Sequence, residues 1–280
     1  AKAELVEAVD PGGSVVLNAD DARVVRMADL TRAPALFFGL SNAAQVRATD
    51  VAVAGEGLCF HLQLPSGRAQ VRLHTPARFM VHNALAAAAV GYHQGVEAPE
   101  IAAALSTFQA TAGRMFLRVL GRDVRLIDDT YNANPVSMAA AIDTLCDRKT
   151  DRRRAVVAGD MFELGSRSAE LHAGIGELAA RRDIARLYLA GEFAPVVASA
   201  ARGAGMDPER IFVGTREEIV SDLDAWLRPG DWVLVKGSRG MAMETVVQGL
   251  AAVLGPAEPM DKGAPPKEKR NGCRPKEALT

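Results

Sequence analysis

The stretch VRLIDDTYNANPVSMAA (124–140) passes from an apolar run through a polar segment into an alanine-rich run. This order predicts a buried strand, a loop and a helix. Asn134 suits the N-cap and Pro135 the first helical position, so capping explains two of the polar-segment residues. Pairs of carboxylates beside a helix N-terminus could also hold ribose hydroxyls or a metal-bound phosphate. Whether they only punctuate the chain or bind a ligand stays open for the residues that capping leaves unexplained: Asp128, Asp129, Tyr131 and Asn132.

The same alternation of strand and helix continues to residue 254. Further strands are predicted at 154–160, 186–191, 210–214 and 231–237. Helices are predicted around 137–147, 168–181, 193–203, 216–227 and 241–253. Strands separated by helices of this length imply right-handed crossovers and a mainly parallel, doubly wound sheet. The fold class is therefore α/β, with a Rossmann-like domain over 113–254.

The sequence before Gly113 has a different texture. Short apolar runs alternate with turn signals, and two of them, 50–64 and 69–75, are joined by Pro65-Ser66-Gly67, which predicts a hairpin. Two helices are predicted within 79–96 and 98–108. We expect 1–112 to be part of another domain, and 255–280, rich in proline and charge, to be a disordered tail.

Composition excludes several classes of function. The chain has 33 basic and 34 acidic residues, so no global field draws nucleic acid or an anionic membrane. Its three cysteines are far apart and in no metal-ligand spacing, which favours a reducing, cytoplasmic setting. No apolar run is long enough to span a bilayer. The chain opens without Met on what reads as the middle of a helix, so we expect a fragment of a longer protein.

Two further polar clusters follow predicted strands. AGDMFELG (158–165) places carboxylates after one strand, and VLVKGSRGMAME (233–244) places glycines, a hydroxyl and two cations between a strand and a helix. The second pattern resembles an anion cradle, although a tight turn would explain its glycines. It is not a Walker A loop, because GxxxxGK[ST] is absent. Neither a GxSxG elbow nor an HExxH motif occurs, so nucleophilic and zinc-protease chemistry find no support.

Six segments in register resemble the Mur ligases of peptidoglycan synthesis: VVLNADD (15–21), RFMVHNALAAAAVG (78–91), AGRM (112–115), IDDTYNANPVSM (127–138), VVAGDMFELG (156–165) and VLVKGSRGMAME (233–244). The resemblance implies the C-terminal part of a central, P-loop ATPase-like domain over 1–112, truncated before its P-loop, followed by the Rossmann-like ligase domain. The segments DDTYNANP and GDMFELG are most similar to the branch that adds D-alanyl-D-alanine to UDP-N-acetylmuramoyl-tripeptide.

The resemblance also implies roles for single residues. Asn83 matches the residue that contacts the adenine of ATP, and Arg114 the one that reaches its phosphates. Asp128 or Asp129, with Asp129 favoured, matches the aspartate at the ATP ribose. Lys2 falls at the position of a lysine that is carbamylated and helps to hold Mg²⁺. The residues implied for D-alanyl-D-alanine are Tyr131, Asn132, Asn134, Lys236, Ser238 and Arg239.

The implied reaction is acyl activation by ATP. The tripeptide carboxylate is phosphorylated, and the dipeptide amine attacks the acyl phosphate, so catalysis depends on positioning and on charge neutralisation by Mg²⁺ and cations. We expect a cytoplasmic monomer whose 280-residue piece is inactive alone. Two alternatives remain: a noncatalytic nucleotide- or peptide-binding module derived from a Mur ligase, and a ligase related to folylpolyglutamate synthases.

Overall fold

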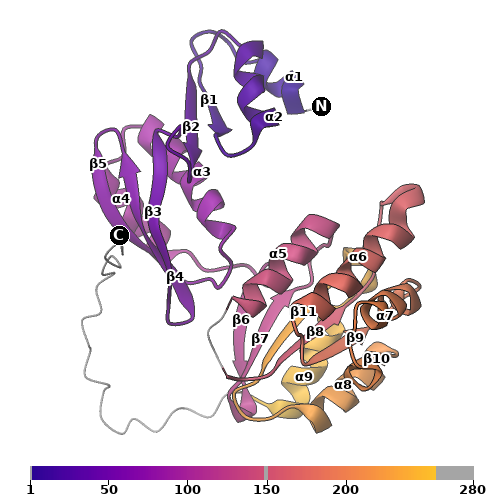
Figure 1. Ribbon diagram of the computed structural model, residues 1–280. Coiled ribbons are helices and arrows are strands. Elements are labelled where there is room, and N and C mark those ends of the chain that lie inside the picture. The colour runs from indigo at the N-terminus through magenta and orange to yellow at the C-terminus, as the bar shows by residue number, and fades with distance from the viewer. Residues whose placement is uncertain (1, 148–150, 257–280) are drawn as a thin grey trace, which may run out of the picture. The chain divides into compact units, whose positions relative to one another are not determined.

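The computed structural model describes residues 2–147 and 151–256, and the chain divides into two compact units, the first ending at Gln109 (Figure 1). In the first unit five strands form one sheet in chain order, with β1 to β3 parallel and β3 to β5 antiparallel. Its elements are α1 (Lys2–Glu7), β1 (Val15–Asn18), α2 (Ala22–Val25), β2 (Ala35–Gly39), β3 (Val46–Ala54), β4 (Gly57–Leu64), β5 (Gly67–Leu73), α3 (Met80–His93) and α4 (Ala98–Thr107).

The core of the first unit lies between this sheet and helices α3 and α4. Leu58, Phe60 and Leu62 alternate along β4, as one buried face of a strand requires, and are fully buried. From α3, Val81 and Leu85 pack into the same cluster. The predicted hairpin at 65–67 is confirmed, since β4 and β5 pair antiparallel up to Leu64 and Gly67.

The pattern of the apolar run at 50–64 predicted one strand, but the structure divides this run between β3 and β4. The chain turns back at Gly55 and Glu56, so that β3 pairs antiparallel with β4. Gly55 takes a φ of +61°, a conformation that glycine adopts without steric cost. Because apolar residues continue on both sides of this turn, periodicity alone did not separate the two strands.

The second unit is built on a six-stranded sheet in the order β10-β9-β8-β11-β7-β6. Its strands are β6 (Phe116–Leu120), β7 (Val124–Asp129), β8 (Arg154–Ala158), β9 (Arg186–Leu189), β10 (Ile211–Val213) and β11 (Trp232–Lys236). Its helices are α5 (Pro135–Cys146), α6 (Ser168–Arg181), α7 (Ala194–Gly203), α8 (Arg216–Trp226) and α9 (Glu244–Leu254). All pairings are parallel except that of β6 with β7, which confirms the predicted α/β class. The antiparallel edge strand β6 was not predicted.

Helices cover both faces of this sheet. α5, α6 and α7 lie on one face, and α8 and α9 on the other (Figure 1). The central strand β11 is therefore buried along its whole length, which explains its continuous apolar sequence. Since β11 pairs with β7 on one side and β8 on the other, the polar segments after these three strands meet at one edge of the sheet.

Two boundaries differ from the predictions. Helix α9 begins at Glu244 rather than 241, because Ala242 takes a left-handed conformation with φ of +47°. Gly255 and Pro256, the first residues of the predicted tail, are paired with the sheet: the carbonyl of Gly255 accepts from the Gly121 amide, and Pro256 bridges to Leu120. The rest of that segment lies outside the described residues. Within those residues, no helix combines the length and apolarity needed to cross a bilayer.

Candidate active site

A buried ion pair joins the ends of β7 and β11. The Lys236 ammonium donates to Asp129 Oδ2 at 2.6 Å and to the carbonyl of Asn132 at 2.8 Å. The other carboxylate oxygen of Asp129 accepts from the Met115 amide at 3.0 Å. Lys236 is 2% exposed and Asp129 8% exposed, so these charges depend on one another for compensation. Both were predicted as ligand-binding residues, and the structure gives each an internal partner.

The neighbouring carboxylate is also engaged within the protein. Asp128 accepts from the Thr130 hydroxyl at 2.7 Å, and its second oxygen lies 3.6 Å from an Arg118 guanidinium nitrogen. It is 3% exposed. Of the two aspartates only Asp129 faces Lys236, and the preference for Asp129 at the ATP ribose stays a prediction.

The Ser238 hydroxyl ties the three polar segments together. It accepts from the Phe162 amide at 2.8 Å and lies 3.4 Å from the carbonyl of Ala133, to which it donates. The Ser238 amide in turn donates to the carbonyl of Asp160 at 2.9 Å. Ser238 is 2% exposed, so it holds the edge of the sheet in shape from the inside.

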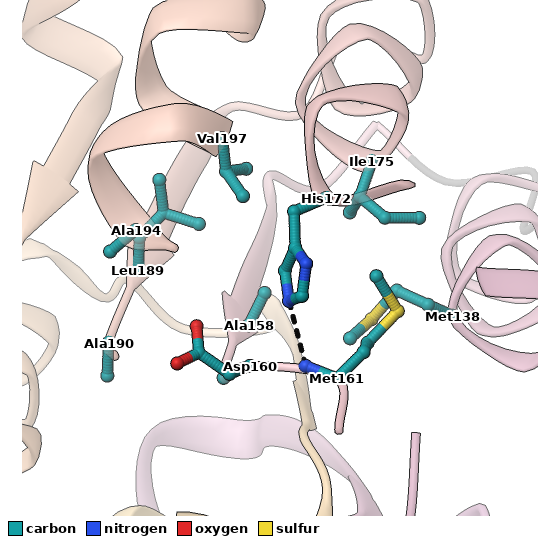
Figure 2. Close-up of a pocket in the computed structure, with 11 residues that line it drawn as sticks. Met138, Ala158, Asp160, Met161, His172, Ile175, Leu189, Ala190, Ala194 and Val197 are labelled. Carbon is teal, nitrogen blue, oxygen red and sulfur yellow. Dashed lines mark hydrogen bonds between the residues drawn. The ribbon is translucent and has the colours of Figure 1, made fainter. Parts of the chain in front are cut away.

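The segment after β8 has two more internal supports. The Asp160 carboxylate accepts from the amides of Glu192 and Phe193 at the start of α7, at 2.7 and 3.1 Å. The imidazole of His172 accepts from the Met161 amide at 2.9 Å through Nε2, as Figure 2 shows. The cavity beside this ring is lined by Asp160 and His172 and otherwise mainly by apolar side chains, and at about 10 Å³ it is too small to be a ligand site.

The exposed side chains of the site form a cationic and aromatic rim. Tyr131 is 46% exposed, and the Arg114 guanidinium carbon lies 3.9 Å from the centroid of its ring. Arg239 approaches the same ring at 5.9 Å. Two guanidinium groups near one exposed aromatic ring offer positive charge to an anion, together with a flat surface.

The two predicted asparagines lie at and just before the start of helix α5. Asn134 is its N-cap: Oδ1 accepts from the Ser137 amide at 2.8 Å, and the Ser137 hydroxyl completes a capping box. Asn132 accepts from the amide of Ala133 at 2.9 Å. Both remain exposed at the same edge as Tyr131. Capping is therefore confirmed for Asn134, and their contacts with a substrate stay a prediction.

Asn83 lies in the first unit, on α3. It is exposed, and its amide nitrogen donates to Met80 Sδ at 3.3 Å. It borders a pocket of about 110 Å³ whose other lining is apolar, from Leu73, Met80, Ala84, Ala87, Leu105 and Phe108. An apolar pocket beside an amide suits a heteroaromatic ring, because the amide can pair with ring nitrogens.

The residue before Asn83 is fixed by Asp20. His82 Nε2 lies 2.9 Å from Asp20 Oδ2, and the amides of Leu40 and Ser41 donate to the same carboxylate. Burial raises the pKa of Asp20, but these hydrogen bonds outweigh it and lower the pKa to about 2. The carboxylate thus links β2 to α3. Lys2, in contrast, is exposed in the first turn of the short helix α1.

Both units of the chain match models of known protein families. Residues 1–91 match the family model described as the Mur ligase middle domain, and residues 113–239 match that of the Mur ligase glutamate ligase domain. The chain belongs to the Mur ligase family. Each matched range lies within one of the two compact units of the structure.

Several relatives of the chain share the same enzyme name. UDP-N-acetylmuramoyl-tripeptide--D-alanyl-D-alanine ligase of Mycobacterium bovis is 36% identical, over 90% of this chain and 53% of its own. The enzyme of that name from Escherichia coli is 32% identical, over 89% of this chain and 54% of its own. A crystal structure of MurF from Acinetobacter baumannii matches with a TM-score of 0.79 and 27% identity, covering 90% of this chain and 55% of that one. The chain thus spans about half the length of these relatives.

The described part of this Mur ligase chain holds no cluster of metal-ligating side chains. Within 2–147 and 151–256, no three or more His, Cys, Asp or Glu side chains gather as metal ligands. Lys2 stands on an exposed helical turn. The role of a carbamylated Lys2 in holding Mg²⁺ therefore stays a prediction.

Sequence reasoning had not singled out Phe162, and it had given His172 no role. The Phe162 side chain is 46% exposed. In the sequence, the only sign that Phe162 has a role was an aromatic residue inside GDMFELG. His172 lies eleven residues after Met161, on another element. No local motif links His172 to Met161, so the hydrogen bond between them became visible only in the structure.

Proposed function

We propose that the complete protein is an ATP-dependent ligase that joins D-alanyl-D-alanine to UDP-N-acetylmuramoyl-tripeptide. One observation carries the proposal: the two segments most similar to this branch of the family follow β7 and β8, and they meet at one edge of the sheet with the segment after β11. Relatives that match nine tenths of the chain bear this enzyme name. In doubly wound sheets, ligands bind at this edge.

In the proposed reaction, ATP phosphorylates the terminal carboxylate of the tripeptide. The dipeptide amine then attacks the acyl carbon, and the tetrahedral intermediate releases phosphate. Negative charge spreads over the transferring phosphoryl group, so fixed cations lower the barrier. Arg114, exposed and stacked on Tyr131, is the cation that we assign to the phosphates.

We assign the nucleoside part of ATP to two places. Asn83, at the mouth of its apolar pocket, pairs with the adenine, and Asp129 accepts from a ribose hydroxyl. Each oxygen of Asp129 has one internal donor, and a carboxylate can accept more than two hydrogen bonds. A structure of MurF from Thermotoga maritima was solved in complex with ADP, although at 23% identity that likeness supports only the fold. Mg²⁺ enters the proposal as the ion that accompanies ATP phosphates.

The incoming dipeptide is assigned to the rim of the second unit. Tyr131, Asn132, Asn134 and Arg239 are exposed there, and the Arg239 guanidinium suits a carboxylate. Lys236 and Ser238 are buried beneath these exposed residues, and their hydrogen bonds hold the loops that carry them. We further propose a cytoplasmic monomer, and carbamylation of Lys2 remains part of the proposal.

The test uses the protein produced from its complete reading frame. Phosphate release should require ATP, the UDP-linked tripeptide and D-alanyl-D-alanine together, and the 280-residue chain alone should release none. Arg114→Gln should lower kcat by about 10²- to 10³-fold, as loss of one charge-stabilising donor does elsewhere. Arg181→Gln, on an exposed residue paired with Glu177 on α6, is the matched control.

Two outcomes would contradict the proposal. Nucleotide binding without turnover on any of these substrates would favour the noncatalytic module. Turnover with glutamate added to a folate would favour the ligase related to folylpolyglutamate synthases.

A further inference from the structure

We propose that Phe162 forms an apolar wall against the C-terminal residue of the incoming dipeptide, and that His172 and Ser238 position it. This inference rests on the proposed function and specifies its acceptor site. It adds a specificity-determining residue, Phe162, and a positioning residue, His172, neither of which contributes to the charged part of the site.

Phe162 stands on the rim already described. A Cβ built on Gly240 would lie 2.6 Å from Phe162 Cε2, so the ring lies directly against the Gly240 backbone. The guanidinium of Arg239, the residue before Gly240, lies 5.9 Å from the centroid of the Tyr131 ring. The Phe162 ring and the Tyr131 ring thus lie near consecutive residues of the loop after β11, Phe162 against Gly240 and Tyr131 near the Arg239 guanidinium.

The backbone of the wall is held on both sides. The Phe162 amide donates to Ser238 Oγ at 2.8 Å, and the Met161 amide to His172 Nε2 at 2.9 Å. Nδ1 of His172 lies 2.7 Å from the carbonyl of Ser168, which places the proton on Nδ1 and leaves the Nε2 lone pair to accept from the Met161 amide. The imidazole also stacks on Phe193, with ring centroids 4.3 Å apart.

These supports serve a side chain that the core does not use. Phe162 is 46% exposed, whereas His172 and Ser238 are each 2% exposed. The next residue, Glu163, takes a φ of +62°, which is costly for a residue other than glycine. A buried frame and a strained turn that together present an exposed aromatic ring are typical of a prepared binding surface.

The chemistry of the dipeptide fits this surface. Its carboxylate suits Arg239, and the methyl group beside that carboxylate would then face the Phe162 ring next to Gly240. One methyl group in an apolar pocket changes kcat/KM by about 10-fold or more. The wall should therefore discriminate between D-alanyl-D-alanine and D-alanyl-glycine, which lacks only that methyl group.

The experiment measures this ratio with the protein from its complete reading frame. We expect the wild type to prefer D-alanyl-D-alanine by about 10-fold or more in kcat/KM, and Phe162→Ala to reduce the preference below about 3-fold. Val253→Ala removes a comparably exposed apolar side chain near the end of α9 and should leave the ratio unchanged.

Two substitutions test the positioning role. His172→Phe keeps an aromatic ring for the stack but leaves the Met161 amide without its acceptor. It should lower the ratio and raise the KM for the dipeptide about tenfold, with the KM for ATP unchanged. His172→Gln retains an acceptor and should stay within about threefold of the wild type. Hydrogen exchange at the Met161 and Phe162 amides should accelerate in His172→Phe and stay unchanged in His172→Gln.

The results separate the two proposals. A complete protein that uses no D-alanyl dipeptide would refute the proposed function and the wall with it. Turnover with an unchanged ratio in Phe162→Ala would refute the wall alone. If His172→Phe lowers stability but leaves the ratio and the dipeptide KM as they were, His172 is only structural.

Discussion

Removing the ammonium of Lys236 should destabilise the second unit strongly. Lys236→Met leaves the Asp129 carboxylate 8% exposed with the Met115 amide as its remaining donor, and the carbonyl of Asn132 loses its partner. Removing one member of a buried ion pair costs about 3–5 kcal/mol. For a unit of this size, each kcal/mol corresponds to roughly 2–4 °C in Tm, so we expect a decrease of about 10 °C.

The double variant Asp129→Asn/Lys236→Met separates charge from packing. It removes both charges, so it should recover most of the loss and lie within about 2 kcal/mol of the wild type. Both tryptophans of the chain, Trp226 and Trp232, are in the second unit, so urea unfolding followed by tryptophan fluorescence reports on that unit. The reasoning is wrong if Lys236→Met costs less than about 1 kcal/mol, or if the double variant is no more stable than the single one.

Three further perturbations test other parts of the structure. Asn134→Ala removes the cap of α5 and should cost about 1 kcal/mol in urea unfolding, whereas Asn134→Asp should cost less; equal losses would exclude capping. Gly191→Ala places a Cβ 2.4 Å from the Asp160 carboxyl carbon at a φ of +117°, so we expect a loss above about 2 kcal/mol, and a neutral result would contradict the packing. The folded-state pKa of Asp20 is about 2 against 3.8 for the free side chain, so its stabilisation is complete above 3.8 and is lost as the pH falls toward 2. Circular dichroism melts of Asp20→Asn and the wild type should therefore differ at pH 6 and converge near pH 2, and a constant difference would oppose this assignment.

The periodicity of the sequence predicted helices and strands correctly where one local rule decides the structure. The strands of the second unit and the start of α5 were predicted because buried parallel strands read as apolar runs, and because an Asn-Pro pair favours one helical start. It performed less well at Gly55 and Ala242, where a single left-handed residue turns the chain or delays a helix. Edge strand β6 was missed because its sequence, FLRVL, shows no clear alternation of apolar and polar residues.

The candidate site shows the same division. The sequence placed Asp128, Asp129 and the polar residues after β7 beside one helix start, since all lie within a few positions of each other. It could not distinguish Asp129 from Asp128 by spacing, because adjacent carboxylates differ only in what faces them. Lys236 faces Asp129 across 107 positions of chain, and this pairing exists only once β7 and β11 are adjacent.

By itself, the sequence determined the α/β class, the strand-loop-helix pattern and the family, because these depend on local periodicity and on short motifs. The tertiary structure alone decided which polar residues support the site and which face outward. Lys236, Ser238 and His172 are buried and bonded, whereas Tyr131, Arg239 and Phe162 stand at the rim. The physical reason is that burial and hydrogen bonding are set by neighbours distant in the chain, which local sequence patterns do not record.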